Sequence, residues 1–154
     1  MPGNIGDDAA KQAVLAFALM YAACGMRVFP VTADKKPLIK WKEGASADPA
    51  AIEAMWRRWP YADIAWALPA GVVVLDIDVK HGLNGYRDFV RLTGSSAFGA
   101  ETPMTTMPSG GLQLFYAGSK TYKNAAPAIP GTGLDTRAEG GLVVLPGPAT
   151  GGRG

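Results

Sequence analysis

The chain has 154 residues, a length typical of one domain that can bury a sizeable core. Apolar residues make up 48% and charged residues 18%, which argues against intrinsic disorder. The 15 basic and 13 acidic residues give a net charge of +2, too small by itself to indicate a nucleic-acid partner. The single cysteine excludes an internal disulfide and a cysteine-rich zinc site, and the single histidine argues against a Ser-His-Asp triad.

The first expected element is an apolar helix, which Asp7 or Asp8 can cap and which runs to about Ala23. Residues 13–24 are wholly apolar, but this run is shorter than the ~20 residues that cross a bilayer. The residues before it also lack the positive charge of a secretory signal. We therefore expect a buried helix, no membrane partner and a cytoplasmic protein.

A short strand is expected next, at residues 27–32, where Pro30 favours the edge of a sheet. A lysine-rich loop follows over residues 33–47. Residues 49–59 then have the spacing of an amphipathic helix, and Asp48 is well placed to cap it.

The strongest strand signal lies at residues 71–79, a β-branched and nearly wholly apolar run that favours a central place in a sheet. The remaining expected elements are a strand before it, a helix after it and two hairpin-like pairs of strands, at residues 63–68, 82–92, 104–107 with 112–117, and 134–138 with 142–145. This order is neither strict βαβ alternation nor all-β. We expect an α+β fold, with a mixed or antiparallel sheet flanked by helices, and one domain over residues 1–154.

Two carboxylates, Asp76 and Asp78, lie at i and i+2 of the central strand and should point to the same face. Close carboxylates repel each other and are costly to desolvate, and Mg²⁺ or Mn²⁺ removes that cost by taking hard oxygen ligands. The alternative is that both acids lie at a strand end and reach water. Asp135 also follows an apolar residue in an expected strand. If that strand neighbours residues 71–79, the three acids form one cluster that suits two-metal phosphoryl transfer.

Residues 108–111 (Pro-Ser-Gly-Gly) form a candidate anion-binding turn, because glycines admit close backbone N–H groups and serine adds a donor. Hairpin turns commonly have the same composition. In the strand that follows, Gln113 lies among apolar residues and needs a polar partner, either a ligand phosphate or base or a neighbouring backbone. Arg137 shares the face of Asp135, where it would neutralise a triphosphate or pair with an acid.

Four lysines fall within residues 35–42, a segment without an acid: Lys35, Lys36, Lys40 and Lys42. They are candidates for contacts with a nucleic-acid backbone, which would make binding depend on salt. The alternative is a solvated loop.

The ordered set of motifs resembles the archaeo-eukaryotic primase superfamily, and most closely the bifunctional primase-polymerases of plasmids, phages and replicative helicase fusions. The shared features are Asp-x-Asp in an apolar strand, Pro-Ser-Gly-Gly before a strand, and an apolar-Asp strand followed by Gly-Gly. Supporting stretches are Lys35-Lys36-Pro37 with Trp41, and the runs at 76–82 and 135–146. The resemblance covers roughly residues 10–150.

The resemblance implies an RNA-recognition-like sheet and template-directed nucleotidyl transfer in plasmid, phage or mobile-element replication. It implies a catalytic two-metal site for Mg²⁺ or Mn²⁺, without zinc, at Asp76, Asp78 and Asp135. It implies that the phosphates of a dNTP or NTP contact Ser109, Gly110 and Gly111. We expect Gln113 and Arg137 to contact the same phosphates. The implied partners are a single-stranded DNA template or primer and a C-terminal helicase domain, so that this chain would be an N-terminal fragment.

One departure from the family pattern is Gln113, where the family usually has histidine. Glutamine donates a hydrogen bond but carries no positive charge, so activity would be weaker, altered or absent. A primase-like domain that only binds nucleotide or nucleic acid is therefore the main alternative. Haloacid-dehalogenase-type phosphatases and nucleotide-sugar glycosyltransferases also use Asp-x-Asp. The first needs a Thr or Ser soon afterwards, where this chain has Val79-Lys80, and the second needs a larger preceding nucleotide-binding half.

Overall fold

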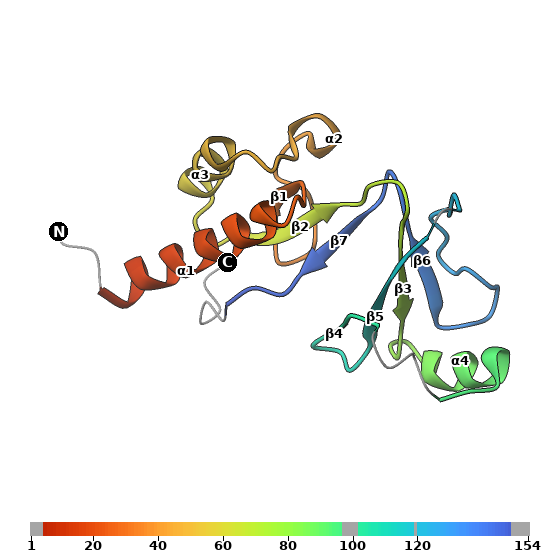
Figure 1. Cartoon of the computed structure of the whole chain (residues 1–154). Helices are drawn as coiled ribbons and strands as arrows, with labels where there is room; N and C mark the ends of the chain where they lie inside the picture. Colours follow the sequence, from red (N-terminus) through yellow and green to blue (C-terminus); the bar gives the residue numbers. More distant parts are fainter. Residues whose placement is uncertain (1–4, 97–101, 119, 149–154) are drawn as a thin grey trace. The chain divides into compact units, whose positions relative to one another are not determined.

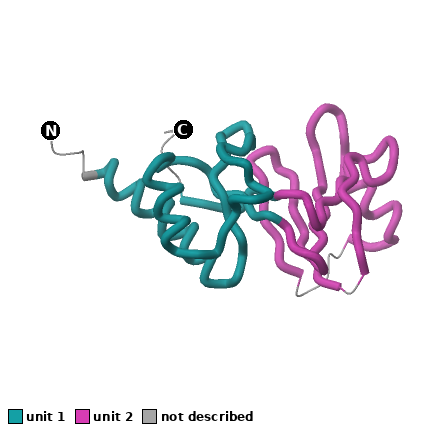
Figure 2. Tube along the Cα trace, turned by 90° about the horizontal axis from the view of Figure 1, so that it is seen from above, with its two compact units in different colours: residues 1–67, 143–154 teal, residues 68–142 magenta. Residues whose placement is uncertain are grey.

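The computed structural model describes residues 5–96, 102–118 and 120–148 (Figure 1). The chain forms two compact units, coloured teal and magenta in Figure 2. Unit 1 comprises residues 1–67 and 143–154, and unit 2 comprises residues 68–142. Both contain an antiparallel sheet and at least one helix, which confirms the expected α+β class.

Unit 1 is built from a small sheet of order β1-β2-β7 and its helices. Its elements are α1 (Ile5–Ala23), β1 (Val28–Val31), α2 (Trp41–Gly44), α3 (Pro49–Arg58), β2 (Asp63–Ala67) and β7 (Leu142–Leu145). As expected, Pro30 lies in the edge strand β1, where its missing N–H costs least. The short helix α2 lies inside the region that the sequence predicts as a loop.

A buried apolar face stabilises helix α1, and an N-terminal cap stabilises helix α3. Helix α1 buries one face rather than its whole surface, at Val14, Ala18 and Ala22. Helix α3 begins as expected, because the Asp48 side chain accepts a hydrogen bond from the N–H of Ala51 at 3.1 Å. Among the helices of the described residues, none is long and apolar enough to cross a membrane.

Unit 2 carries a four-stranded antiparallel sheet of order β4-β5-β3-β6, and helix α4 packs on one of its faces. Its elements are β3 (Val72–Ile77), α4 (Gly85–Thr93), β4 (Met104–Thr106), β5 (Leu112–Ala117) and β6 (Leu134–Arg137). The central place expected for residues 71–79 is confirmed. The core under α4 contains Ile77, Phe89, Leu112, Leu114 and Leu134.

The predicted hairpin between residues 134–138 and 142–145 is wrong. Strand β6 pairs with β3 in unit 2, whereas β7 joins the sheet of unit 1. The turn between them carries the chain from one sheet to the other, with Gly140 at φ +80°. The apolar pattern of each segment predicts a strand, and both strands are present, but such a pattern does not specify which strand pairs with which.

Candidate active site

Four polar residues line up across the sheet of unit 2. The strand registers set Asp76 directly opposite Gln113 on β5 and opposite Asp135 on β6, and they set Gln113 opposite Thr105 on β4. Directly opposed residues share a face, so these four side chains lie on one side of the sheet. Helix α4 covers the other side, because Ile77, the neighbour of Asp76, lies in its core. We call Thr105, Gln113, Asp76 and Asp135 the polar row.

Asp78 follows β3 directly and lies at the same end of the sheet as Asp76 and Asp135. Its N–H donates to the carbonyl of Gly133 at 2.7 Å, two residues before Asp135. Its carboxylate Oδ1 accepts a hydrogen bond from the N–H of Lys80 at 2.9 Å. The sequence analysis expects a cluster of three acids if the strand of Asp135 neighbours that of Asp76. The two strands are neighbours in the sheet.

The electrostatics of this region disfavour charge on Asp135. Its burial raises the pKa of the Asp135 carboxyl, and the nearby charge of Asp78 raises it further. Arg137, two residues along the same strand, partly offsets both effects by lowering that pKa. Directly opposed residues such as Asp76 and Asp135 have Cβ atoms about 4.5–5.5 Å apart. A cation between such acids would relieve their repulsion.

The acids fit Mg²⁺ or Mn²⁺ by their chemistry, because both ions prefer carboxylate oxygen. In residues 5–96, 102–118 and 120–148, however, no three His, Cys, Asp or Glu side chains converge closely enough to hold an ion. The backbone therefore brings Asp76, Asp78 and Asp135 to one end of the sheet, while their carboxylates do not meet at one point. Binding of an ion would have to draw them together.

The Pro-Ser-Gly-Gly segment forms the tight turn between β4 and β5. The N–H of Met107 donates to the carbonyl of Gly111 at 2.8 Å, and the N–H of Gly110 donates to the carbonyl of Met107 at 2.9 Å. Gly110 has φ +89°, and a Cβ on Gly111 would lie 2.5 Å from the carbonyl oxygen of Ile77. The turn thus lies against the end of β3, next to Asp78. Ser109 is exposed there, whereas the N–H of Gly110 is already used within the turn.

Gln113 has a partner that the sequence did not suggest. Its side chain is 4% exposed, and its Oε1 accepts a hydrogen bond from the hydroxyl of Thr105 at 3.0 Å. The sequence predicted a ligand or a neighbouring backbone in this role. Only the pairing of β4 with β5, which sets the two residues opposite each other, could have identified Thr105. Arg137 is half-buried, and its Nη1 donates to the carbonyl of Thr136 at 3.2 Å.

Comparison with known proteins adds one decisive observation. The family described as bifunctional DNA primase/polymerase, N-terminal, matches residues 18–154. The chain belongs to this family. No curated protein sequence matches it. The family assignment supports primase- or polymerase-type nucleotidyl transfer and a role in DNA replication, and the match spans both compact units.

The four lysines of this primase/polymerase-family domain lie in unit 1, whereas the acids lie in unit 2. All four are exposed, and Lys35 has φ +63° in the turn after β1. Between them, Trp41 stacks on Phe29 with ring centroids 5.2 Å apart, and the Lys42 ammonium lies 5.7 Å from the Trp41 ring centroid. An exposed lysine segment around an aromatic ring suits contact with a nucleic-acid backbone, and it also suits a solvated loop.

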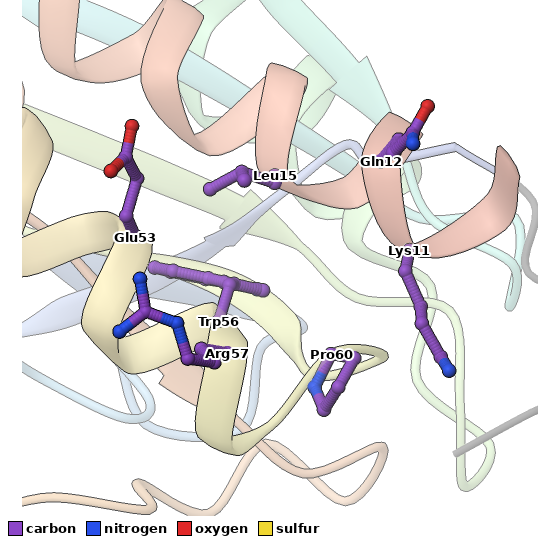
Figure 3. Close-up of a pocket in the computed structure, with 7 residues that line it drawn as sticks. All are labelled: Lys11, Gln12, Leu15, Glu53, Trp56, Arg57 and Pro60. Carbon is purple, nitrogen blue, oxygen red and sulfur yellow. The ribbon is translucent and has the colours of Figure 1, made fainter. Parts of the chain in front are cut away.

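Unit 1 of the primase/polymerase-family domain also contains a groove of about 480 Å³ between α1 and α3 (Figure 3). It is lined by Lys11, Gln12, Leu15, Glu53, Trp56, Arg57 and Pro60. Its sides carry charges of both signs, and Trp56 is held by a hydrogen bond from its Nε1 to the carbonyl of Ala62. None of the residues that the sequence predicts for the active site lines this groove.

Asp88 is a buried acid of the primase/polymerase-family domain that the sequence reading missed. It is 3% exposed, and its Oδ2 accepts a hydrogen bond from the N–H of Gly133 at 2.9 Å. A signal for it was present, because Gly85, Asp88 and Phe89 share one face of α4 at helical spacing and all three are buried. An acid on the buried face of a helix needs a partner, here at the start of β6.

Proposed function

We propose that the domain extends a DNA primer on a single-stranded template by nucleotidyl transfer, with unit 2 as the catalytic part. The observation that carries this proposal is the register that sets Asp76 opposite Asp135, with Asp78 bonded to the backbone two residues before Asp135. Acids grouped at one end of a sheet can supply carboxylate ligands for two-metal phosphoryl transfer, and the Ser-Gly-Gly turn lies beside them. The family assignment supports the same reaction class.

Asp76, Asp78 and Asp135 would hold Mg²⁺ or Mn²⁺ rather than zinc. When bound, these ions would supply a lowered pKa for the primer 3′-hydroxyl and charge stabilisation for the leaving pyrophosphate. Asp78 would be oriented by the hydrogen bond from Lys80 N–H, and Asp135 by its place opposite Asp76. Burial raises the pKa of Asp135, and a bound cation would act in the opposite direction by favouring the charged carboxylate.

The incoming dNTP or NTP would be bound by the turn of Ser109, Gly110 and Gly111, together with Arg137. Gly110 would contribute through the shape of the turn, because its N–H already donates to the carbonyl of Met107. Ser109 offers an exposed hydroxyl, and Arg137 offers a guanidinium on the face of the polar row. Gln113, held by Thr105, would present its amide group toward the neighbouring acids rather than a positive charge. The expected consequence is slower transfer than with a cationic residue at this position.

The lysines of unit 1 would hold the template backbone without reading its sequence. Lys35, Lys36, Lys40 and Lys42 are exposed, so each can neutralise a phosphate. We further propose that the domain acts in the cytoplasm on plasmid, phage or mobile-element DNA, coupled to a C-terminal helicase domain.

A second candidate function is nucleotide or nucleic-acid binding without polymerisation. The buried, uncharged Gln113 is the observation that favours it. Retention of all three acids weighs against it, because uncovered carboxylates would repel a phosphate backbone.

Primer extension in Mn²⁺ tests the proposal and separates the two candidates. Wild-type protein should extend a primer, and Asp76→Asn should lower the rate by at least ~10²-fold, because a metal ligand is lost. Glu139→Gln, a neutralised acid in an exposed turn of unit 2, is the matched control and should keep wild-type activity. Extension that survives Asp76→Asn refutes the active site. Nucleotide binding without extension by the wild type supports the second candidate.

A further inference from the structure

In unit 2, three hydrogen bonds connect helix α4 with the end of β3 and the start of β6. The N–H of Asp78 donates to the carbonyl of Gly133 at 2.7 Å, and the N–H of Gly85 donates to the carbonyl of Asp78 at 2.8 Å. The N–H of Gly133 in turn donates to Oδ2 of Asp88 at 2.9 Å. We call Asp78, Gly85, Asp88 and Gly133 the clasp.

The clasp brings three backbone segments closer than any side chain would allow. A Cβ on Gly85 would lie 2.5 Å from the carbonyl oxygen of Gly133 and 2.8 Å from that of Asp78. A Cβ on Gly133 would lie 2.5 Å from the carbonyl oxygen of Asp78. Real Cβ atoms essentially never come within 3.0 Å of such neighbours. The glycines therefore let the segments meet, and the hydrogen bonds determine how they meet.

Asp88 is the one side chain of the clasp that makes a clasp hydrogen bond. The guanidinium groups of Arg87 and Arg91 lie 3.7 and 4.0 Å from its Oδ1, and both arginine side chains are largely exposed. The bond from Gly133 is shorter and buried, so it compensates best for the burial of the carboxylate. Gly133 is bonded directly to Asp78 and precedes Asp135 by two residues. Asp88 thus lies one hydrogen bond away from the backbone that carries two of the proposed metal ligands.

We propose that Asp88 is a positioning residue that sets the spacing between the carboxylates of Asp78 and Asp135, and with it the affinity of unit 2 for a divalent cation. This inference rests on the proposed function of the three acids. Removal of the Asp88 carboxylate leaves the N–H of Gly133 buried without its acceptor. The start of β6 can then move relative to the end of β3. Loss of a group that orients a metal ligand without touching the metal typically lowers metal affinity 10- to 100-fold.

The test is a titration of the whole domain with Mn²⁺ alone, in which the electron paramagnetic resonance signal of free Mn²⁺ measures binding. Asp88→Ala should raise the Mn²⁺ dissociation constant by about 10-fold or more. Asp88→Asn should stay close to the wild type, because its amide oxygen can still accept from Gly133. In primer extension, Asp88→Ala should raise the Mn²⁺ concentration for half-maximal rate and leave the KM for primer unchanged. If Asp88→Ala does not fold, Asp88→Glu, whose acceptor is displaced by one methylene, carries the same expectation.

Phe89→Ala is the control for a merely structural role. Phe89 is buried in the same helix and packs in the core without taking part in the clasp. A Mn²⁺ shift in Phe89→Ala as large as that in Asp88→Ala would overturn the inference, and so would wild-type affinity in Asp88→Ala. In either case, a wild-type protein that binds Mn²⁺ would leave the proposed function standing. A wild-type protein that binds no Mn²⁺ would refute the inference and the proposed metal site together.

Discussion

The substitution Gly133→Ala should damage the active site by geometry alone. Gly133 is not in the left-handed region, so alanine is acceptable to its backbone and only space is at issue. The added Cβ would lie 2.5 Å from the carbonyl oxygen of Asp78 and 2.9 Å from the nitrogen of Gly85. Both neighbours are backbone atoms, which cannot rotate away.

The size of the effect follows from these distances. Ordinary Cβ contacts begin at 3.4 Å. The ends of β3 and β6 must therefore separate by roughly 0.9 Å to accept the methyl group. Overpacking of this kind costs about 1–3 kcal/mol of unfolding free energy. A displacement near 1 Å at a reacting centre can cost ~10²-fold in rate, so we expect a loss of 10- to 100-fold in primer extension.

The assay compares Gly133→Ala with Gly131→Ala, two residues away. Gly131 has φ +77° and nothing within 4 Å of its Cβ position, so alanine there strains the backbone by about 1–2 kcal/mol without a clash. Urea unfolding should show that both variants are destabilised, whereas primer extension should fall only in Gly133→Ala. A Gly133→Ala protein with wild-type rate and stability would refute the reasoning. Equal loss of rate in the two glycine variants would also refute it.

The remaining predictions concern a buried hydrogen bond, a titrating acid and the lysines. Thr105→Val leaves Gln113 Oε1 without its donor and should cost about 1–3 kcal/mol by urea unfolding, whereas Thr105→Ser should cost less than half of that. Because burial raises the pKa of Asp135 in the folded protein, its contribution to stability is fully present below the ordinary value of 3.8 and is lost as pH rises through the folded pKa. Asp135→Asn should remove this loss of unfolding free energy with rising pH, so the variant should be more stable than the wild type at pH 7. A variant whose unfolding free energy falls more steeply with pH than that of the wild type would contradict this. The last prediction concerns the four exposed lysines, Lys35, Lys36, Lys40 and Lys42. Their replacement by glutamine should make the slope of log affinity for single-stranded DNA against log salt concentration less negative by up to about 3 units. An unchanged slope would exclude their role in template binding.

Local signals in the sequence predicted most elements of the fold. The β-branched run of residues 71–79 is the central strand β3, and Asp48 caps α3 as its position before Pro49 indicates. Such signals work because capping, turn chemistry and side-chain periodicity act over a few residues. The short helix α2 escaped prediction because four residues are too few to show a helical period.

Pairing between strands was the step that local signals could not predict. Residues 134–138 and 142–145 have the turn and the apolar residues of a hairpin, yet β6 and β7 belong to different sheets. The partner of a strand is chosen by the surface it buries and by the hydrogen bonds it completes far along the chain. The same limit hid Thr105 as the partner of Gln113 and Asp88 as the partner of Gly133, because both bonds join separate elements.

The sequence by itself determined the chemical inventory of this domain: an Asp-x-Asp strand, a third acid, a Ser-Gly-Gly turn and a family of DNA primase/polymerases. These are properties of residue type and short spacing, which the chain carries whether or not it is folded. Only the tertiary structure decided that Asp76 faces Asp135 across two strands and that Gly133 joins Asp78 to Asp88. Those contacts depend on the strand register and on backbone segments that approach more closely than a Cβ atom would allow. Both arise only when the whole of unit 2 is packed.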